Sequence, residues 1–337
     1  MEKSKKSLSY AESGVDIKVE EATISALTAA MTFKRMGLGA PLGDIGHYAG
    51  LIDFGEYVLA LATDGVGSKV LIANEMKRWN TVGIDCIAMN VNDLLAMAIE
   101  PIAFVDYLAV QSHNQEFSRQ IGEGLAKGAE FSRMSIVGGE TATLPEIVNG
   151  FDLAGTCLGM AKKGTTIAGE NVKVGDKLIG IASSGVHSNG YTLVRRIVAE
   201  SGYSYADPLP DDPSVTIGDA LLEPTRIYME ILDLAKAVDV HGLAHITGSG
   251  LLKLRRLTEL GFLFDDPIKP QPVFDFLMRE GNVSLLEMYR TFNMGMGFVV
   301  VVDEADVDET VRITGGKVVG EIVEKEMGIR VGGMEVK

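Results

Sequence analysis

Short apolar segments that run directly into glycine-rich turns recur along the chain, and this alternation restricts the fold more than any other feature. Residues 57–62 lead into residues 63–69, and residues 176–182 lead into Ser183, Ser184 and Gly185. Apolar residues at helical spacing follow both turns. Strands that alternate with helices in this way predict a mixed α/β fold in both halves of the chain.

The length of 337 residues predicts two domains. Lysines and glycines crowd residues 161–175, which we interpret as a connector. We therefore expect domains at 1–165 and 166–337, with a polar arm over residues 1–13. Further helices are expected over residues 20–36, 69–78, 81–99, 117–131, 190–201 and 226–237 and from residue 251. Further strands are expected over residues 102–110, 135–137, 151–160, 297–302 and 317–323.

Charge and composition exclude several classes of function. The formal net charge of −15 argues against general nucleic-acid binding, which requires a basic face. No secretory signal opens the chain, and apolar runs such as residues 298–302 are far too short to span a bilayer. Cys86 and Cys157 stand alone in apolar surroundings and are expected to be buried thiols. We expect a soluble protein of the reducing cytoplasm, with no membrane partner.

The turn at residues 63–69 is the first candidate for chemistry. Its two glycines let the backbone approach an anion, and the helix that follows adds partial positive charge. Asp64 is a candidate Mg²⁺ ligand and Lys69 a candidate phosphate contact. An ordinary tight turn capped by aspartate explains the same letters, and the glycine spacing is not that of a P-loop.

Polar residues on an apolar helix form a second candidate set. Asp85 and Asn92 are seven positions apart and share one helix face, and Asp93 follows directly. Buried carboxylates are costly unless they are paired or bound to metal, which favours a metal site over a solvated face. Residues 138–141, Gly-Gly-Glu-Thr, are interpreted as a glycine-rich turn with one acid, after the strand at residues 135–137.

The second half of the chain contains two further glycine- and serine-rich loops. Residues 183–191 and 245–250 both follow a predicted strand and precede a predicted helix, the layout of an anion site. His187 and His245 are candidate donors or proton shuttles. A lone histidine is as readily a structural residue, and that alternative stays open for both.

The ordered set of motifs resembles the family of phosphoribosylformylglycinamidine cyclo-ligases, also called aminoimidazole ribonucleotide synthetases. The resemblance runs from Tyr10-Ala11-Glu12-Ser13-Gly14-Val15-Asp16 to about Gly297. It includes the 63–69 loop, Gly83-Ile84-Asp85, Asn90-Val91-Asn92-Asp93, Glu100-Pro101, residues 137–142, 183–191, 224–228 and 245–250, and Met288-Tyr289-Arg290-Thr291-Phe292-Asn293.

The resemblance implies a reaction and its cofactors. ATP phosphorylates the formyl-amide oxygen of formylglycinamidine ribonucleotide, the amidine attacks the resulting iminophosphate, and aminoimidazole ribonucleotide, ADP and phosphate are released. ATP and Mg²⁺ are the implied cofactors, with K⁺ a further candidate ion. The implied architecture is a homodimer in which an N-terminal domain contributes strands to a shared barrel and a C-terminal α/β domain packs against it.

The resemblance also implies roles for individual residues. His245, Lys69 and Asp93 are the expected catalytic residues, and Asp64, Asp93 and Glu140 the expected metal ligands. The expected nucleotide contacts are Thr63, Asp64, Gly65, Gly67, Ser68, Lys69, Asp85, Asn92, Gly139, Glu140 and Thr141. The expected substrate contacts are His187, Ser188, Asn189, Thr247, Gly248 and Asn293.

The chain departs from the family pattern at three places. Thr28 stands where bacterial members carry a lysine linked to ATP, Gly43-Asp44-Ile45-Gly46 replaces a Gly-Gly-Phe-Gly element, and Met294 follows Asn293 where a cysteine is common. Another ATP-using member of the superfamily, such as thiamine-monophosphate kinase, is the alternative function. A nucleotide-binding assembly partner without turnover is the alternative from a different class.

Overall fold

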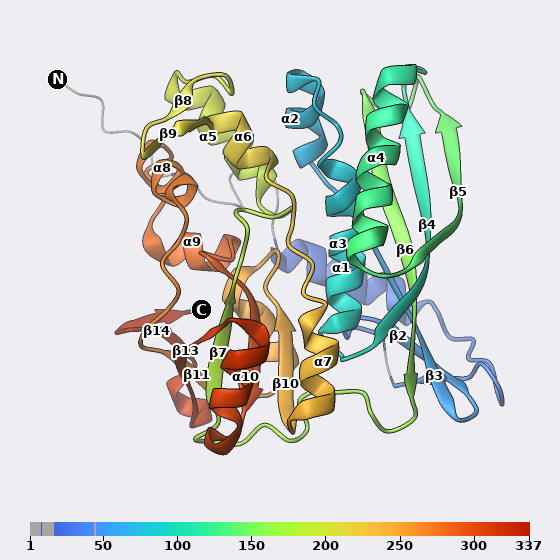
Figure 1. The fold of residues 1–337 in the computed structure, drawn as a ribbon, viewed down its shortest axis with the longest axis vertical. Coiled ribbons are helices and arrows are strands. Elements are labelled where there is room, and N and C mark those ends of the chain that lie inside the picture. The colour runs from blue at the N-terminus through green and yellow to red at the C-terminus, as the bar shows by residue number, and fades with distance from the viewer. Residues whose placement is uncertain (1–7, 9–16, 44) are drawn as a thin grey trace.

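Two open β-sheets with helices packed on them form the molecule, which confirms the two-domain α/β fold (Figure 1). The computed structural model describes residue 8, residues 17–43 and residues 45–337. The arm expected over residues 1–13 lies outside the described residues apart from Leu8. The motif from Tyr10 to Asp16 and the residue Asp44 also lie outside them.

The first sheet contains six strands in the order β1-β2-β3-β6-β4-β5. Its strands are β1 Pro41–Leu42, β2 Gly50–Phe54, β3 Tyr57–Gly65, β4 Glu100–Val110, β5 Ser135–Thr143 and β6 Phe151–Lys162. The helices of this half are α1 Ile17–Ala29, α2 Lys69–Met76, α3 Val82–Leu95 and α4 Gln115–Phe131. Only β4 and β5 pair in parallel; the other neighbours are antiparallel. Helices α3 and α4 pack on one face of this sheet (Figure 1).

The second sheet contains seven strands in the order β10-β12-β7-β13-β11-β14-β15. Its strands are β7 Lys177–Ala182, β10 Val240–His245, β11 Gly261–Phe264, β12 Met296–Val302, β13 Lys317–Val323, β14 Ile329–Val331 and β15 Met334–Val336. Its helices are α5 Tyr191–Ser201, α6 Ile217–Leu222, α7 Glu230–Ala237, α8 Pro272–Glu280, α9 Leu285–Thr291 and α10 Val307–Thr314. Short 3₁₀ segments lie at η2 Gly250–Arg256, η3 Glu304–Asp306 and η4 Lys325–Met327, and β8 Pro208–Leu209 pairs with β9 Asp212–Thr216.

Helix α3 lies between the first sheet and the second half of the molecule (Figure 1). All of its residues except Asp93 are buried, including Asp85, Asn90 and Asn92. Burial on all sides explains why its sequence is apolar nearly throughout. The three buried polar residues therefore need partners inside the protein, and those partners determine the site described below.

Two predicted elements differ from the structure because of long-range contacts. The helix expected over residues 226–237 begins at Glu230, and residues 223–228 are extended instead. Their backbone forms hydrogen bonds with Asp85 and Asn92 of α3 rather than with itself. The turn expected at residues 138–141 is wrong, because these residues continue strand β5 in parallel with β4.

Two smaller differences concern helix ends and helix type. The helix expected over residues 20–36 is α1, which ends at Ala29. The helix expected from residue 251 is the 3₁₀ segment η2, which follows Ser249 and begins at Gly250, and both residues have positive φ. Successive left-handed residues there prevent a regular α-helical start.

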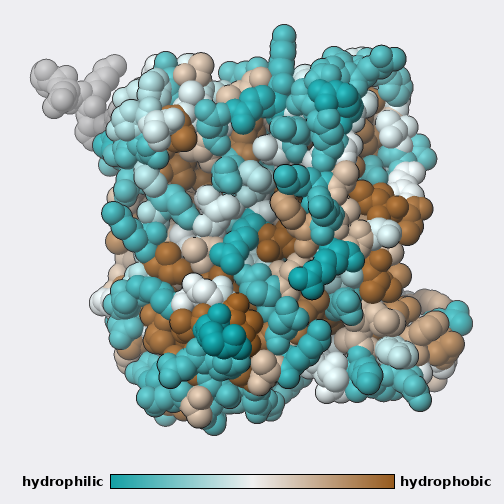
Figure 2. All heavy atoms as spheres, viewed as in Figure 1, coloured by the Kyte–Doolittle hydropathy of each residue, from teal (hydrophilic) through white to brown (hydrophobic). Residues whose placement is uncertain are grey.

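The face of the first sheet that lies opposite α3 and α4 carries exposed apolar side chains. Leu61, Val105 and Tyr107 lie on this face, with Leu61 47% and Tyr107 44% exposed. Brown apolar atoms follow the right-hand edge of the molecule in Figure 2, on the side where Figure 1 shows the first sheet. We name this side of the first sheet, which carries Leu61, Val105 and Tyr107, the open face.

Gly155 in β6 tests how tightly α3 packs on this sheet. A Cβ atom at this position would lie 2.0 Å from Cζ of the buried Phe104 ring. We predict that Gly155→Ala lowers the free energy of unfolding by about 1–3 kcal/mol, because the ring has to move within a close-packed core. Urea unfolding monitored by tryptophan fluorescence measures the change.

Gly138→Ala is the matched control, since it adds the same methyl group to a strand of the same sheet. Its nearest neighbour would be Val105 Cγ1 at 3.8 Å, an ordinary contact. Equal unfolding midpoints for the two variants would contradict the packing argument.

Candidate active site

The 63–69 loop connects β3 to α2 and faces the second half of the molecule. Asp64 is one of the last residues of β3, and its Oδ1 accepts a hydrogen bond from Gly65 N at 2.7 Å. Gly67 has a φ of +69°, which a residue with a side chain rarely adopts. A Cβ atom there would lie 4.0 Å from Ser188 O, so the loop directly abuts the 183–191 loop. Ser68 Oγ lies 3.3 Å from Thr192 Oγ1 across the same boundary.

Asp93 and His245 meet across the two halves. His245, the last residue of β10, places Nδ1 3.0 Å from Asp93 Oδ1. Because an ionised carboxylate only accepts hydrogen bonds, Nδ1 carries the proton. The His245 ring is fully buried and stacks on Phe298 at 6.4 Å. His245 therefore orients Asp93, and no edge of its ring is open to solvent.

Asp93 and His245 both influence the pKa of Asp64. Burial and the negative charge of Asp93 raise the pKa of Asp64 above its ordinary value, while Gly65 N, His245 and Lys253 oppose that shift. Two partly desolvated carboxylates that repel each other favour a divalent cation between them. Asp64 and Asp93 thus have the donor chemistry and the electrostatics that fit Mg²⁺.

The carboxylates of Asp64 and Asp93 do not complete a metal site by themselves. Among the residues that the structure describes, no three His, Cys, Asp or Glu side chains lie close enough together to hold a metal ion. Mg²⁺ commonly takes one or two protein carboxylates and fills its remaining positions with phosphate oxygens and water. The pair is consistent with that mode.

Glu140 is separated from Asp64 within one chain. In the pairing register, Gly65 lies beside Ala154, Ala154 beside Tyr107, and Tyr107 beside Glu140, which places Glu140 about 14 Å away across three strand spacings. Glu140 also shares the open face with Tyr107, whereas Asp64 lies on the opposite face. A single metal ion bound by Asp64, Asp93 and Glu140 of one chain is therefore not supported.

Three other residues expected to contact the nucleotide, Gly139, Thr141 and Thr63, are in contact with the protein itself. A Cβ atom at Gly139 would lie 2.4 Å from Asp106 Oδ1, so the glycine makes room for that side chain. Thr141 pairs with Leu108 in the β4–β5 ladder. Thr63 is on the open face of β3, where its Oγ1 donates to Gly155 O at 2.9 Å. None of these three contacts the Asp64–Asp93 pair in one chain.

Lys69 is enclosed and fully engaged. Its side chain is 0% exposed, and Nζ lies 2.8 Å from Asp85 Oδ2. Nζ also donates to His187 O at 3.0 Å and to Glu223 O at 2.7 Å. An ammonium group has three donors, and all three are used. The structure gives no support to the phosphate contact expected of Lys69.

Asp85 and Asn92 bind protein backbone instead of nucleotide. Asp85 Oδ1 accepts from Thr225 N at 2.8 Å and from Thr225 Oγ1 at 2.7 Å. Asn92 donates to Arg226 O at 2.8 Å and accepts from Tyr228 N at 3.2 Å. Both side chains are 0% exposed. Because both side chains are buried and bind protein backbone, the structure gives no support to the nucleotide contacts expected of these two residues.

The 183–191 loop is built around buried polar contacts. His187 has a φ of +66°, its ring is buried, and its Nε2 accepts from Ser184 N at 3.2 Å. Burial lowers its pKa well below the ordinary value, so the ring is neutral near pH 7. Asn293 donates to Gly185 O at 2.9 Å and accepts from Gly295 N at 2.9 Å. Both side chains hold the loop in its conformation. His187 Nδ1 has no hydrogen-bond partner within the described residues, whereas the amide group of Asn293 both donates and accepts hydrogen bonds.

Other predicted substrate residues lie where two loops meet. A Cβ atom at Gly248 would lie 3.0 Å from Asn189 Oδ1, so the 245–250 and 183–191 loops are in close contact. Thr247 is buried beside them, and Ser188 Oγ lies 3.3 Å from Thr225 Oγ1. The structure thus brings Asn189, Thr247 and Gly248 together, at the boundary that the 63–69 loop also reaches.

Two contributors were missed from the sequence. Lys253 lies in η2 directly after the 245–250 loop, and its charge lowers the pKa of Asp64. The cluster Lys253, Arg255 and Arg256 in so acidic a chain was the available signal. Asp106 faces the same side of the sheet as Asp64, and burial raises its pKa. It lies within a predicted strand that otherwise looks like core, so no local pattern marked it.

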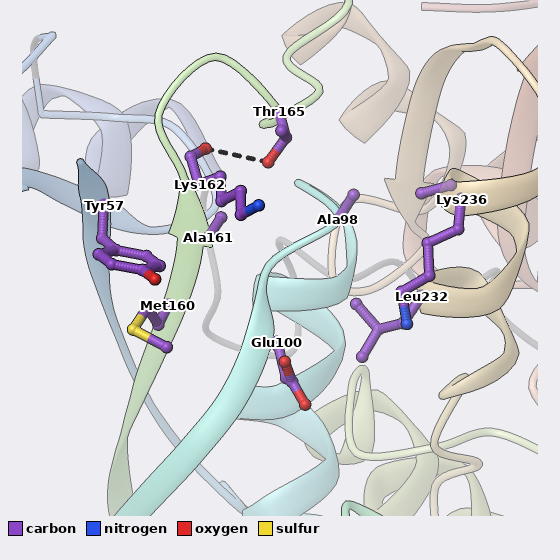
Figure 3. A pocket seen from close by; sticks show the side chains of 10 residues that line it. Tyr57, Ala98, Glu100, Met160, Ala161, Lys162, Thr165, Leu232 and Lys236 are labelled. Atoms are coloured by element: carbon purple, nitrogen blue, oxygen red, sulfur yellow. Dashed lines mark hydrogen bonds between the residues drawn. The ribbon is translucent and has the colours of Figure 1, made fainter.

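A separate cavity of about 480 Å³ lies between the first sheet and α7. Figure 3 shows Tyr57, Met160 and Lys162 on one side of it, with Leu232 and Lys236 of α7 opposite and Glu100 between them. It contains none of the predicted site residues. In the part of the chain that the structure describes, no helix has the length and apolar character needed to cross a membrane.

Two family models together match most of the chain from residue 46 to residue 332. AIR synthase related protein, N-terminal domain, covers residues 46–161, and AIR synthase related protein, C-terminal domain, covers residues 173–332. A phosphoribosylformylglycinamidine cyclo-ligase from Methanococcoides burtonii is 70% identical over 98% of this chain and 99% of its own length. The enzyme of that name from Pyrococcus furiosus is 49% identical over 91% of each chain.

Solved structures with the same fold are more distant in sequence. The tt0281 protein from Thermus thermophilus has a TM-score of 0.68 at 20% identity and covers 94% of this chain and 98% of its own. AaThiL complexed with AMPPCP and TMP has a TM-score of 0.66 at 14% identity and covers 96% of this chain and 97% of its own. At these identities the likeness concerns the fold.

Substitution of Asp64 tests the electrostatic repulsion between Asp64 and Asp93. Because the folded-state pKa of Asp64 is raised above 3.8, its ionised form costs the fold stability at neutral pH. This cost disappears as the pH falls to the unfolded pKa, where the group is protonated in both states. We predict that Asp64→Asn raises the melting temperature of the ligand-free protein at pH 7.5 by roughly 1–3 °C.

The gain from Asp64→Asn should shrink steadily as the pH is lowered toward 4, which differential scanning fluorimetry across that range measures. Asp152→Asn, at an exposed carboxylate of β6, is the matched control and should show no such trend. A melting temperature that falls at pH 7.5 in Asp64→Asn would contradict the proposed repulsion.

Proposed function

The chain belongs to the AIR synthase related family, among the phosphoribosylformylglycinamidine cyclo-ligases, and is an enzyme of the ligase class; from that premise we propose that it uses ATP to close the imidazole ring of formylglycinamidine ribonucleotide. The products are 5-aminoimidazole ribonucleotide, ADP and phosphate, in purine biosynthesis. The observation that carries the proposal is the Asp64–Asp93 pair, at a boundary where glycine-rich loops of both halves converge.

The reaction has two bond-forming steps. The γ-phosphoryl group of ATP passes to the formyl-amide oxygen, the bond to the bridging oxygen of ADP breaks, and the amide nitrogen loses its proton, which gives the iminophosphate. The amidine nitrogen then bonds to the activated carbon, the carbon–oxygen bond to phosphate breaks, and a proton leaves the nitrogen. Phosphoryl transfer of this kind depends on positioning and on stabilisation of negative charge.

Residues at the boundary between the two halves would supply that positioning. Asp93, oriented by His245, and Asp64 at the end of β3 would hold Mg²⁺, which when bound neutralises charge on the triphosphate. The 63–69 loop presents its backbone from one half, and Lys253 adds a positive charge from the other. Asn189, Thr247 and Gly248, gathered at the same boundary, are the proposed substrate contacts.

Relatives of the same fold support the use of ATP. AaThiL was solved with the nucleotide analogue AMPPCP, and PurL from T. maritima was solved with ADP. Thiamine-monophosphate kinases are also among these neighbours, which keeps that activity as the alternative. Their identities of 15–19% contrast with 70% for the cyclo-ligase from M. burtonii, and this difference favours ring closure.

We propose a homodimer that forms through the open face. The row of apolar side chains on this face would be buried by a second copy of the sheet. Glu140 shares the open face, so it and its neighbours would reach a nucleotide site only across the subunit boundary. In this arrangement residues 1–165 bind ATP and form the dimer, and residues 166–337 carry the substrate side. The buried free thiols Cys86 and Cys157 fit a cytoplasmic enzyme.

The deciding experiment is an assay of the purified protein with ATP, Mg²⁺ and formylglycinamidine ribonucleotide, scored for aminoimidazole ribonucleotide. We predict product formation that requires both ATP and Mg²⁺. We also predict that Asp93→Asn lowers kcat at least about 100-fold, because the carboxylate loses its negative charge at the reacting centre.

Asp152→Asn is the control and should keep full activity. Turnover of thiamine monophosphate without ring closure would transfer the proposal to the kinase alternative. Normal activity in Asp93→Asn would remove Asp93 from the site while leaving the ring-closure activity intact.

Substitution on the open face tests the dimer. We predict that Leu61→Lys shifts the protein from dimer to monomer in analytical ultracentrifugation, because it puts a charge into the proposed interface. Val174→Lys is the matched control, at a residue 46% exposed in the segment between the two sheets. A parent protein that sediments as a monomer at micromolar concentration would rule out the interface.

A further inference from the structure

The strongest unassigned feature is a polar contact network between the two halves, centred on Lys69 and Asp85. Both side chains are 0% exposed, and they form an ion pair at 2.8 Å. Lys69 lies at the start of α2 and Asp85 in α3, so both belong to the first half of the molecule. The remaining partners of this pair come from the second half.

Apart from His187 in the 183–191 loop, those partners lie on one segment, Glu223 to Tyr228, which we name the strap. Lys69 binds Glu223 O, and Asp85 binds both N and Oγ1 of Thr225. Seven residues beyond Asp85 on α3, Asn92 binds Arg226 O and Tyr228 N. The strap therefore satisfies its backbone on α3 side chains, in place of the helix that its sequence predicts.

The same network reaches both sides of the candidate active site. Lys69 is the last residue of the 63–69 loop that carries Asp64, and its Nζ donates to His187 O in the 183–191 loop. Asn92 adjoins Asp93, and Asn92 Nδ2 lies 3.5 Å from His245 Nε2. A displacement of the strap would thus be transmitted to Asp93, to His245 and to the loop around Ser188.

We propose that Lys69 and Asp85 are positioning residues, an internal clamp that binds the strap and holds the two halves of the active site in register. The clamp does not bind phosphate. The buried ammonium is matched by one carboxylate and two carbonyls, and it lies 5.6 Å over the ring of Tyr191, which closes its remaining side. The turnover measurements below rest on the proposed ring closure; the stability and ATP-binding measurements do not.

The first experiment is a double-mutant cycle on thermal stability. Lys69→Met leaves a buried carboxylate without its cation, and Asp85→Asn leaves a buried ammonium without its anion. Each should lower the melting temperature by roughly 6–20 °C. Lys69→Met/Asp85→Asn leaves neither charge unpaired, so it should lose less than the sum of the single variants and less than the worse of the two.

Lys177→Met is the matched control. Lys177 pairs with Glu321 at 2.9 Å, but both partners lie in the second sheet and are partly exposed. The same substitution there should change the melting temperature by at most about 2 °C. Additive losses in the Lys69–Asp85 cycle would contradict a coupled clamp.

The second experiment separates a clamp from a phosphate ligand. ATP affinity is measured by isothermal titration at a temperature where each variant is folded, and kcat is measured per folded site. A clamp predicts that Lys69→Met and Asp85→Asn both keep the ATP Kd within about threefold, while kcat falls at least about tenfold because the reacting groups are misplaced. The double variant should recover part of that loss.

A phosphate role predicts the opposite pattern, and it would overturn the proposal. The ATP Kd would rise at least about tenfold in Lys69→Met and in the double variant, but not in Asp85→Asn. Unchanged kcat per folded site in both single variants would reduce the pair to a purely structural contact and would equally overturn the positioning role. If the parent shows no ring closure, the stability cycle and the ATP Kd still decide the clamp.

Thr225→Val keeps the proposal testable should the charge variants fail to fold. It removes the 2.7 Å bond from Thr225 Oγ1 to Asp85 and the longer 3.3 Å contact with Ser188 Oγ, and it retains the backbone bond from Thr225 N to Asp85. We expect faster hydrogen–deuterium exchange in peptides that cover residues 223–228, unchanged exchange in β12, and a kcat lowered several-fold at unchanged ATP Kd. Parent-like exchange and kcat in this variant would contradict the clamp.

Discussion

The ion pair between Lys69 and Asp85 is the constraint on which the arrangement of the two halves depends. Removing both charges from water costs several kcal/mol per ion, so the fold has to surround them with hydrogen bonds. Carbonyls of His187 and Glu223 and the donors of Thr225 supply those bonds. Because these partners come from distant parts of the chain, the pair can be satisfied only when the two halves are docked.

The docking explains both the strap and the apolar character of α3. A helix packed on a sheet normally keeps one polar face toward water, but α3 is covered on that face as well. Its polar residues Asp85 and Asn92 are positioned where the strap crosses, and they replace the hydrogen bonds that a helix over residues 226–229 would have made for itself. Asp93, the exception to burial, is the residue of α3 that turns toward the candidate active site.

Local pattern predicted the α/β class and marked Asp64 and Asp93 separately as candidate metal ligands, and the family resemblance placed the two in one site. Strand-to-turn alternation identifies the elements, and a carboxylate after a strand is visible in a short window. Lys69 was expected to contact phosphate because it ends a glycine-rich loop, and the family resemblance implied nucleotide contacts for Asp85 and Asn92. A metal site was favoured for the latter two because buried polar groups need partners, and that premise was sound. The partner of Asp85 lies 140 positions away, however, so a single sequence does not distinguish a protein partner from a ligand.

The Gly-Gly-Glu-Thr segment illustrates the same limit at shorter range. Glycine pairs usually mark turns, but Gly139 here serves a strand, since its missing side chain leaves space for Asp106 on β4. The strand assignment then fixes the face of every following residue, because side chains alternate across a sheet. It is this alternation that carries Glu140 to the open face and away from Asp64.

The distribution of charge around Asp64 and Asp93 bears on how a phosphate compound could bind there. A chain with a net charge of −15 repels phosphate compounds at long range. The carboxylates of Asp64 and Asp93 add repulsion at short range. Lys253 offsets part of that repulsion, but the cationic group nearest to the 63–69 loop, Lys69, is already committed to Asp85. Under the proposed function, a divalent cation bound with the triphosphate would add the positive charge that Lys69 does not supply. Because the buried lysine is used to hold the two halves together, nucleotide binding in the proposed reaction would depend on that cation.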